Sequence, residues 1–196
     1  MSDRHVSDQG AAWMLAYQGG DERAFDRLVE KYSGQLFALF TRFLGPAPER
    51  EDLVQEVFLR IVRNRERYEP TARFSTFLYR IAFNLAVNRT EREGSRDVQS
   101  LDGGDDAAPR DFSDPNVVPP SHALEREDVV GAVRAAIAEL SPAQRMALIL
   151  AKYEELPYEQ IAEVMGTSEK AIKSMVHRAR ENLRARLAPY LTEERL

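Results

Sequence analysis

Residues 156–186 read LPYEQIAEVMGTSEKAIKSMVHRARENLRAR, and this stretch holds the clearest structural pattern of the chain. Its first part predicts a short amphipathic helix that ends at Gly166. A Thr167-Ser168 cap begins a second helix, whose apolar side consists of Ala171, Ile172, Met175, Val176, Ala179 and Leu183. Two helices joined by a short turn that contains glycine indicate a helix-turn-helix.

The opposite side of the second helix carries cationic and polar residues, namely Lys170, Lys173, Ser174, His177, Arg178 and Arg180. Such a helix fits the major groove of DNA, with its N-terminal residues at base edges and its lysines and arginines on phosphates. The alternative is a helical hairpin whose charges are only solvated. The joint occurrence of helix, turn and helix signals favours DNA binding.

The composition limits the class of protein. A chain of 196 residues can form one domain or two small ones, and 43% hydrophobic residues suffice for packed cores. The absence of cysteine excludes disulfides and thiolate metal sites and favours a reducing cytosol. No apolar run approaches the ~20 residues of a membrane span, and the N-terminus lacks the apolar core of a signal peptide. We therefore expect a soluble cytoplasmic protein without membrane insertion.

The net charge of −5 is unusual for a free-standing DNA-binding protein, which is usually basic. The acidic charge is concentrated in residues 94–122, where six aspartates face two arginines. Residues 169–186, in contrast, carry six lysines and arginines against two glutamates. This distribution suits local contact with nucleic acid, while the total charge indicates weak affinity for DNA alone.

Further helices are predicted by apolar periodicity and capping residues. They span about residues 21–44, 49–65, 75–93, 123–140 and 142–153, with Asp21, Ser75 and Ser141 as caps of the first, third and fifth. No segment alternates as an exposed strand does. Between residues 94 and 122 the periodicity disappears and Gly, Pro, Ser and Asp dominate, which is typical of a linker. The sequence therefore predicts an all-α protein with two small helical domains, residues 1–93 and 123–196, joined by a flexible acidic linker that leaves them free to stay apart.

The chain shows no constellation typical of an enzyme. Its three histidines, His5, His122 and His177, lie in the N-terminal tail, the linker and the cationic helix. There is no His-Glu-x-x-His motif, no glycine-rich phosphate loop and no paired histidine spacing. We expect no catalysis, no cofactor and no metal site.

Residues 73–84, RFSTFLYRIAFN, give a second nucleic-acid signal because aromatic residues alternate with arginines and short polar residues. Helical spacing assigns Phe77, Leu78, Ile81, Ala82, Leu85 and Ala86 to the core. The same spacing places the remaining residues nearer the outside, namely Thr76, Arg80, Phe83, Asn84, Val87 and Asn88. An exposed Phe83 beside arginine suits the stacking of single-stranded bases. The alternative, that Phe83 packs against the preceding helix, explains the pattern almost as well.

Three motifs together resemble the extracytoplasmic-function sigma factors of bacterial RNA polymerase. They are DLVQEVFLRIVRNRERY at 52–68, RFSTFLYRIAFNLAVNR at 73–89 and LSPAQRMALILAKYEELPYEQIAEVMGTSEKAIKSMVHRARENLR at 140–184. The resemblance covers about residues 13–93 and 123–191, and the three motifs occur in the expected order. It implies a subunit that binds core RNA polymerase and directs it to promoter DNA.

The resemblance also implies roles for individual residues. The residues that contact the clamp helices of the largest polymerase subunit are Asp52, Gln55 and Glu56, for which spacing alone indicates only a solvated helix face. Residues 68–74 and the following helix recognise the minus-ten element and trap a flipped-out base. The candidates there are Arg73, Ser75, Thr76, Arg80, Phe83, Asn84 and Asn88. The minus-thirty-five candidates are Ser168, Lys170, Lys173, Ser174, His177 and Arg178.

The resemblance further implies that residues 146–153 rest near the flap of the second-largest subunit. The aspartates of the linker then imitate RNA phosphates in the exit path, or the linker is only a tether. An anti-sigma factor is a further candidate partner. The chain departs from the usual pattern at Phe77, Phe83, Asn88-Arg89, Met175 and Pro157, so individual base contacts are not assigned.

Two other functions stay open at this point. The first is a stand-alone helix-turn-helix regulator that binds a duplex operator as a dimer. The second is an adaptor whose helices bind only proteins.

Overall fold

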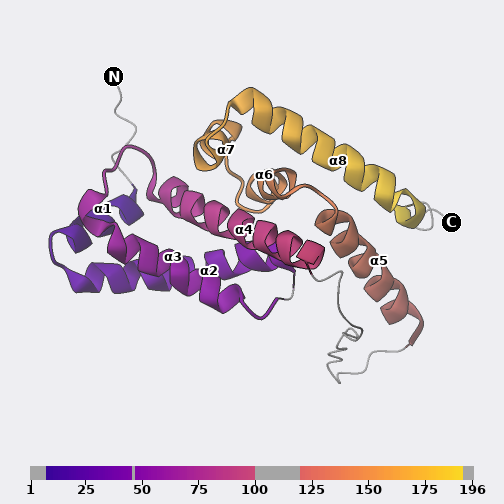
Figure 1. The fold of residues 1–196 in the computed structure, drawn as a ribbon, viewed down its shortest axis with the longest axis horizontal. Coiled ribbons are helices and arrows are strands. Elements are labelled where there is room, and N and C mark those ends of the chain that lie inside the picture. Colours follow the sequence, from indigo (N-terminus) through magenta and orange to yellow (C-terminus); the bar gives the residue numbers. More distant parts are fainter. Residues whose placement is uncertain (1–7, 46, 100–119, 192–196) are drawn as a thin grey trace.

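The computed structural model describes residues 8–45, 47–99 and 120–191, and this part of the chain contains helices and no strands. In the N-terminal half the helices are α1 (Gln9–Gln18), α2 (Glu22–Leu44), α3 (Arg50–Arg63), the short 3-10 helix η1 (Arg65–Arg67) and α4 (Phe74–Gln99). In the C-terminal half they are α5 (Pro120–Ala138), α6 (Pro142–Lys152), α7 (Tyr158–Met165) and α8 (Glu169–Leu191) (Figure 1). The predicted all-α class is confirmed.

Local capping explains several helix ends, as the sequence predicted. The side chain of Asp21 accepts a hydrogen bond from the backbone N–H of Arg23 and begins α2. Ser141 and Gln144 form a reciprocal capping box at the start of α6. Gly166 ends α7 in the left-handed conformation, with φ 64° and ψ 39°, which glycine adopts without steric cost.

The start of α4 differs from the prediction. The helix begins at Phe74, so Ser75 lies inside the first turn and is not its cap. The backbone N–H of Phe74 instead donates to the carboxylate of Asp8, which is 66 residues away in the sequence. The prediction was wrong because a helix can be capped by a side chain that only the tertiary fold brings to it.

The predicted linker is shorter in the structure. Helix α4 continues to Gln99, and α5 already begins at Pro120, so both enter the segment 94–122 that lacks apolar periodicity. Residues 100–119, which include most of the acidic residues of that segment, lie outside the described part of the chain.

Helix α1 was not among the predicted helices, yet it packs tightly on the first bundle. Its residue Gly10 lies so close to its neighbours that a Cβ atom there would be 2.5 Å from the Tyr32 hydroxyl and 2.9 Å from Cδ1 of Phe74. Phe74 is fully buried and lies 5.2 Å from the ring of Tyr32 and 6.2 Å from that of Tyr68, between ring centroids. The aromatic centre of the bundle therefore requires glycine at this point of α1.

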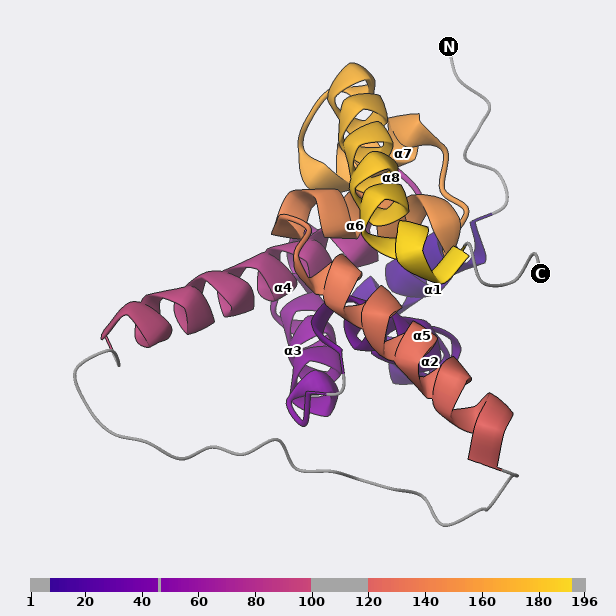
Figure 2. The ribbon, with the colours of Figure 1, turned by 90° about the vertical axis from the view of Figure 1, so that its right-hand side faces the viewer.

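The two helical bundles are in direct contact, although the sequence left them free to stay apart. Helices α6, α7 and α8 lie over one side of the bundle formed by α1 to α4, and α7 packs against α4 (Figures 1 and 2). Buried side chains of both bundles, such as Leu78 of α4 and Met146 of α6, belong to one continuous hydrophobic cluster. This arrangement determines which candidate surfaces face solvent.

Candidate nucleic-acid interfaces

The outer face of α8 carries a group of cationic and polar side chains near the N-terminal end of the helix. Lys170, Lys173, His177 and Arg178 are exposed, and Ser174 between them is half-buried. Among the described residues, no ion pair involves these lysines or Arg178. Their charges are therefore available to phosphate groups or base edges.

The N-terminal end of α8 is built as the sequence predicted. Ser168 is exposed, and its Oγ accepts a hydrogen bond of 3.2 Å from the backbone N–H of Ala171. The buried Ile172 and Val176 attach the helix to α6 and α7. The first turn of α8 thus projects from the turn at Gly166, as major-groove recognition requires.

The candidate minus-ten residues divide between two faces of α4. On the first face Asn84 and Asn88 are exposed, and Arg73 is exposed in the loop directly before the helix. The second face holds Thr76, Arg80 and Phe83, which share one side of the helix because they are four and three residues apart. Ser75, in the first turn, is half-buried. The fold brings all of these residues to one helix but does not leave all of them accessible.

The second face of α4 is directed towards α7. The guanidinium of Arg80 donates two hydrogen bonds, of 2.6 and 3.1 Å, to the backbone carbonyl of Glu163 in α7. Thr76 is only 1% exposed, so its predicted position near the outside was wrong. Phe83 is half-buried and packs against the hydrophobic cluster. The sequence could not show this because α7 is about eighty residues away along the chain.

Polar contacts of Glu154 also join the two bundles. Its carboxylate accepts a hydrogen bond of 2.5 Å from the hydroxyl of the buried Tyr79 and lies 3.5 Å from the guanidinium of Arg42. Burial, with the neighbouring Glu154 carboxylate as a second cause, raises the pKa of Tyr79, so the phenol stays protonated and acts as the donor.

The contact between α4 and α7 is imperfect. The Oγ1 atom of Thr76 and the Oε1 atom of Gln160 are both buried without a hydrogen-bond partner in the described part of the chain. Gln160 lies one turn before Glu163 on α7, on the side that meets Arg80. Unpaired buried polar atoms cost free energy, so separation of the two bundles recovers part of what their contact contributes.

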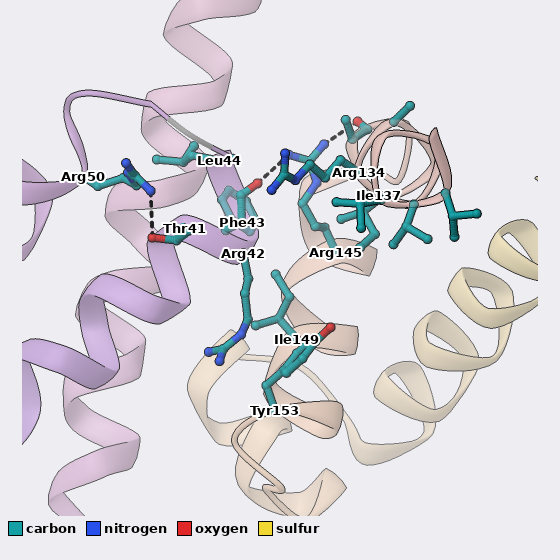
Figure 3. A pocket seen from close by; sticks show the side chains of 16 residues that line it. Thr41, Arg42, Phe43, Leu44, Arg50, Arg134, Ile137, Arg145, Ile149 and Tyr153 are labelled. Atoms are coloured by element: carbon teal, nitrogen blue, oxygen red, sulfur yellow. Dashed lines mark hydrogen bonds between the residues drawn. The ribbon is translucent and has the colours of Figure 1, made fainter. Parts of the chain in front are cut away.

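A groove of about 720 Å³ lies where the end of α2 meets α5 and α6 (Figure 3). Arg145 holds its walls together, because its guanidinium donates to the carbonyl of Phe43 at 2.8 Å, to that of Leu140 at 3.2 Å and also to that of Ala138. Burial lowers the pKa of Arg145, while these three backbone carbonyls, near the ends of α2 and α5, hold the guanidinium in place. The groove is therefore a structural junction between the bundles.

Helix α3 presents the candidate docking face. Asp52 and Gln55 are exposed, while Glu56 is half-buried and pairs with Arg60 at 2.9 Å and Arg63 at 3.6 Å. The hydrogen bond from Arg60 is the main cause that lowers the pKa of the Glu56 carboxyl. All five residues lie on the side of α3 opposite its buried core residues.

Sequence reasoning missed an apolar part of this face. Leu59 is 48% exposed and lies three and four residues after Glu56 and Gln55, on the same side of α3. Val62 beside it is 38% exposed. Leu59 and Val62 therefore add apolar area to the charged face of α3 that holds Asp52, Gln55 and Glu56.

Within the described residues, no group of three or more His, Asp or Glu side chains is placed to hold a metal ion. None of the described helices combines the length and the apolar character that crossing a bilayer demands.

The sequence matches two family models, Sigma-70 region 2 over residues 28–96 and Sigma-70, region 4 over residues 131–183. The chain is 36% identical to the RNA polymerase sigma-H factor of Pseudomonas aeruginosa over 178 residues, which cover 90% of this chain and 92% of that protein. It is 32% identical to the ECF RNA polymerase sigma factor SigE of Mycolicibacterium smegmatis over 190 residues, which cover 95% and 72%.

Solved structures share the fold at lower identity. The sigma factor RpoE of Bartonella quintana, in complex with the anti-sigma factor NepR, matches with a TM-score of 0.63 and 23% identity over 85% of this chain and 98% of that chain. CnrH, in complex with the cytosolic domain of CnrY, matches with a TM-score of 0.65 and 23% identity over 93% and 99%.

Proposed function

Because the chain belongs to the extracytoplasmic-function (ECF) family of RNA polymerase sigma factors, we propose that its two helical bundles divide promoter recognition between them. Residues 1–93 contact core polymerase and the minus-ten element. Residues 123–196 contact the minus-thirty-five element, and residues 94–122 connect the two. The observation that carries the proposal is the exposed outer face of α8, whose cations form no ion pair among the described residues.

In the first bundle, α3 provides the docking face for the polymerase clamp. Asp52, Gln55 and Glu56 contribute the polar contacts, and the exposed Leu59 adds apolar area beside them. The loop at residues 68–73, with its exposed Arg73, and the exposed Asn84 and Asn88 of α4 meet the single-stranded minus-ten element first.

The residues of α4 that meet α7 must change their surroundings before they can bind DNA. Arg80 must exchange the carbonyl of Glu163 for DNA, and Thr76 must lose its cover. The negative total charge fits such a mechanism. Each DNA-binding surface is weak alone, and attachment of both to polymerase raises their effective concentration at the promoter.

Sigma factors in general initiate transcription by binding DNA and are not enzymes, and we propose that this chain catalyses no reaction itself. We also propose that it acts in the cytoplasm, where core polymerase works. An anti-sigma factor is a further expected partner, since the sigma factor RpoE, whose fold this chain shares, is bound to the anti-sigma factor NepR.

Family membership argues against a stand-alone regulator, and reconstitution tests the choice directly. Purified protein is expected to give promoter-specific transcripts only after mixing with core polymerase, and sequencing of the transcript starts should reveal paired promoter elements. Core polymerase without this chain is the control. Tight footprinting by the isolated protein, with no binding to core polymerase in a pull-down, would remove the proposal.

Replacement of Glu154 by alanine is expected to open the closed arrangement. The substitution removes the acceptor of the buried Tyr79 hydroxyl and the partner of Arg42, and a lost hydrogen bond to a charged group costs roughly 1.5–3 kcal/mol. Fluorescence energy transfer between dyes on the two bundles should therefore fall. Glu159→Ala, at an exposed position of α7, is the control and should leave the transfer unchanged. An equal signal from both variants would show that Glu154 does not hold the bundles together.

A further inference from the structure

The loop between η1 and α4 is exposed in its middle and held at both ends. Glu69, Pro70, Thr71 and Arg73 are exposed, whereas the flanking Tyr68 and Phe74 are buried. Both ends of the loop are attached to the same short helix, α1.

The last turn of α1 holds the first end of the loop. The side-chain Nε2 of Gln18 donates to the backbone carbonyls of Arg65, Glu66 and Tyr68, at 3.0, 3.2 and 3.2 Å. Beside it, the Arg65 guanidinium lies 5.0 Å from the ring centroid of Tyr17 and 3.1 Å from the carboxylate of Glu22. Within the described part of the chain, all three hydrogen bonds of Gln18 Nε2 therefore go to the backbone where the loop begins.

The residue just before α1 holds the second end. One carboxylate oxygen of Asp8 accepts from the backbone N–H of Gly10 at 3.0 Å and caps α1. The other accepts from the backbone N–H of Phe74, the first residue of α4. A carboxylate at two helix N-termini is favoured by both helix dipoles. The proximity of Asp8 also contributes, after burial, to raising the pKa of Tyr32 and of Tyr68 to about 12.

We propose that α1 is a brace that holds both ends of this loop at the separation needed to capture a base, with Gln18 and Asp8 as positioning residues. The two attachments come from opposite ends of one rigid ten-residue helix, about 15 Å long, so they fix the loop ends relative to each other. A loop that is ordered before DNA arrives loses less conformational entropy on binding, and its residues are already held in the geometry of the pocket. The inference rests on the proposed minus-ten role of the loop.

The brace is separate from the other functions of the first bundle. Gln18 is half-buried and contributes hydrogen bonds to the loop backbone, while the docking face of α3 lies among other residues, Asp52 to Glu56. A defect confined to the loop should therefore leave the binding of core polymerase intact, whereas general destabilisation of the bundle would reduce both.

The test is Gln18→Glu, which keeps the shape of the side chain but replaces the donor by oxygens that repel three carbonyls. Gln9→Glu, the same chemical change at an exposed position of α1, is the matched control. Holoenzymes made with each variant are titrated with single-stranded oligonucleotides that carry the minus-ten sequence of the mapped promoters, with either the captured base or a substituted base at its position.

Gln18→Glu is expected to weaken binding of the correct oligonucleotide by roughly 5- to 10-fold and to reduce the preference for the captured base, with affinity for core polymerase within about twofold of wild type. Equal weakening for both oligonucleotides, or loss of core binding in parallel, would overturn the proposal. A wild-type holoenzyme without preference for either oligonucleotide would instead overturn the proposed function of the loop, and the brace with it.

A second measurement needs neither DNA nor polymerase. Gln18→Met removes the donor without adding charge, so it separates lost hydrogen bonds from repulsion. Hydrogen exchange of the free full-length variant should become faster at residues 64–74 and stay unchanged in the buried turns of α3. Unchanged exchange in the loop would show that the Gln18 bonds do not restrain it and would overturn the proposal.

Discussion

Simultaneous replacement of Lys173 and Arg178 by alanine is expected to reduce promoter-directed transcription by roughly a hundredfold. Both side chains are exposed on the outer face of α8, and neither forms an ion pair among the described residues. Each contact to a base edge or phosphate contributes about 1–3 kcal/mol, and 1.4 kcal/mol corresponds to a factor of ten. The measurement is transcript yield from a mapped promoter with reconstituted holoenzyme.

The salt dependence of DNA binding gives an independent readout of the same variant. Log affinity falls as log salt concentration rises, and loss of two phosphate contacts should make this fall less steep, by about two in the slope. The control is Arg23→Ala with Arg27→Ala, which removes the same charge from exposed positions of α2. Transcription at the wild-type level with α8 altered would favour the adaptor alternative, in which the helices bind only proteins.

Replacement of Phe74 by alanine is expected to lower the free energy of unfolding by about 3–5 kcal/mol. Phe74 is fully buried and contacts the rings of Tyr32, Tyr68 and Phe77 at centroid distances of 5.2, 6.2 and 6.1 Å. The collapse of this aromatic centre cannot be complete, because α1 is already in close contact at Gly10. The melting temperature should fall by more than about 10 °C in thermal unfolding followed by circular dichroism.

Phe37→Ala is the matched control for this experiment. Phe37 is 38% exposed on α2, and its ring contacts the guanidinium of Arg50 at 5.0 Å from the centroid. An exposed contact of this kind contributes about 0.5–1 kcal/mol. Similar losses from the two substitutions would contradict the packing described for Phe74.

The helix-turn-helix could be predicted almost residue by residue, because its signals are local. Ser168 caps α8 from three residues before Ala171, and Gly166 supplies a backbone conformation that other residues avoid. Periodic apolar residues then define which side of α8 is buried. The opposite side is exposed at Lys173 and Arg178, as the spacing required.

The minus-ten region could be predicted only in part. Exposure was correctly expected for Arg80, Asn84 and Asn88, but Thr76 is buried and Phe83 is packed. The difference arises because α7, from the other bundle, meets this face of α4. A surface that forms between distant parts of a chain leaves no periodic signal in either part.

Helix α1 is a second feature that could not be predicted from the sequence. Its apolar residues are spread around the helix, so no amphipathic pattern marked it, although Met14 and Tyr17 are buried. Its contacts with the ends of the loop before α4 are made by Asp8 and Gln18, whose partners are 66 and 47 to 50 residues away. Nothing near those two residues in the sequence indicates such contacts.

The amino-acid sequence alone was sufficient for the helical class, the family and the exposed cationic side of α8, because caps, turns and apolar periodicity act over a few residues. The tertiary structure decided which face of α4 is covered, how Glu154 joins the bundles and how α1 holds the loop before α4. These features depend on long-range packing and on polar atoms that find partners far along the chain, and such pairings exist only once the helices have assembled.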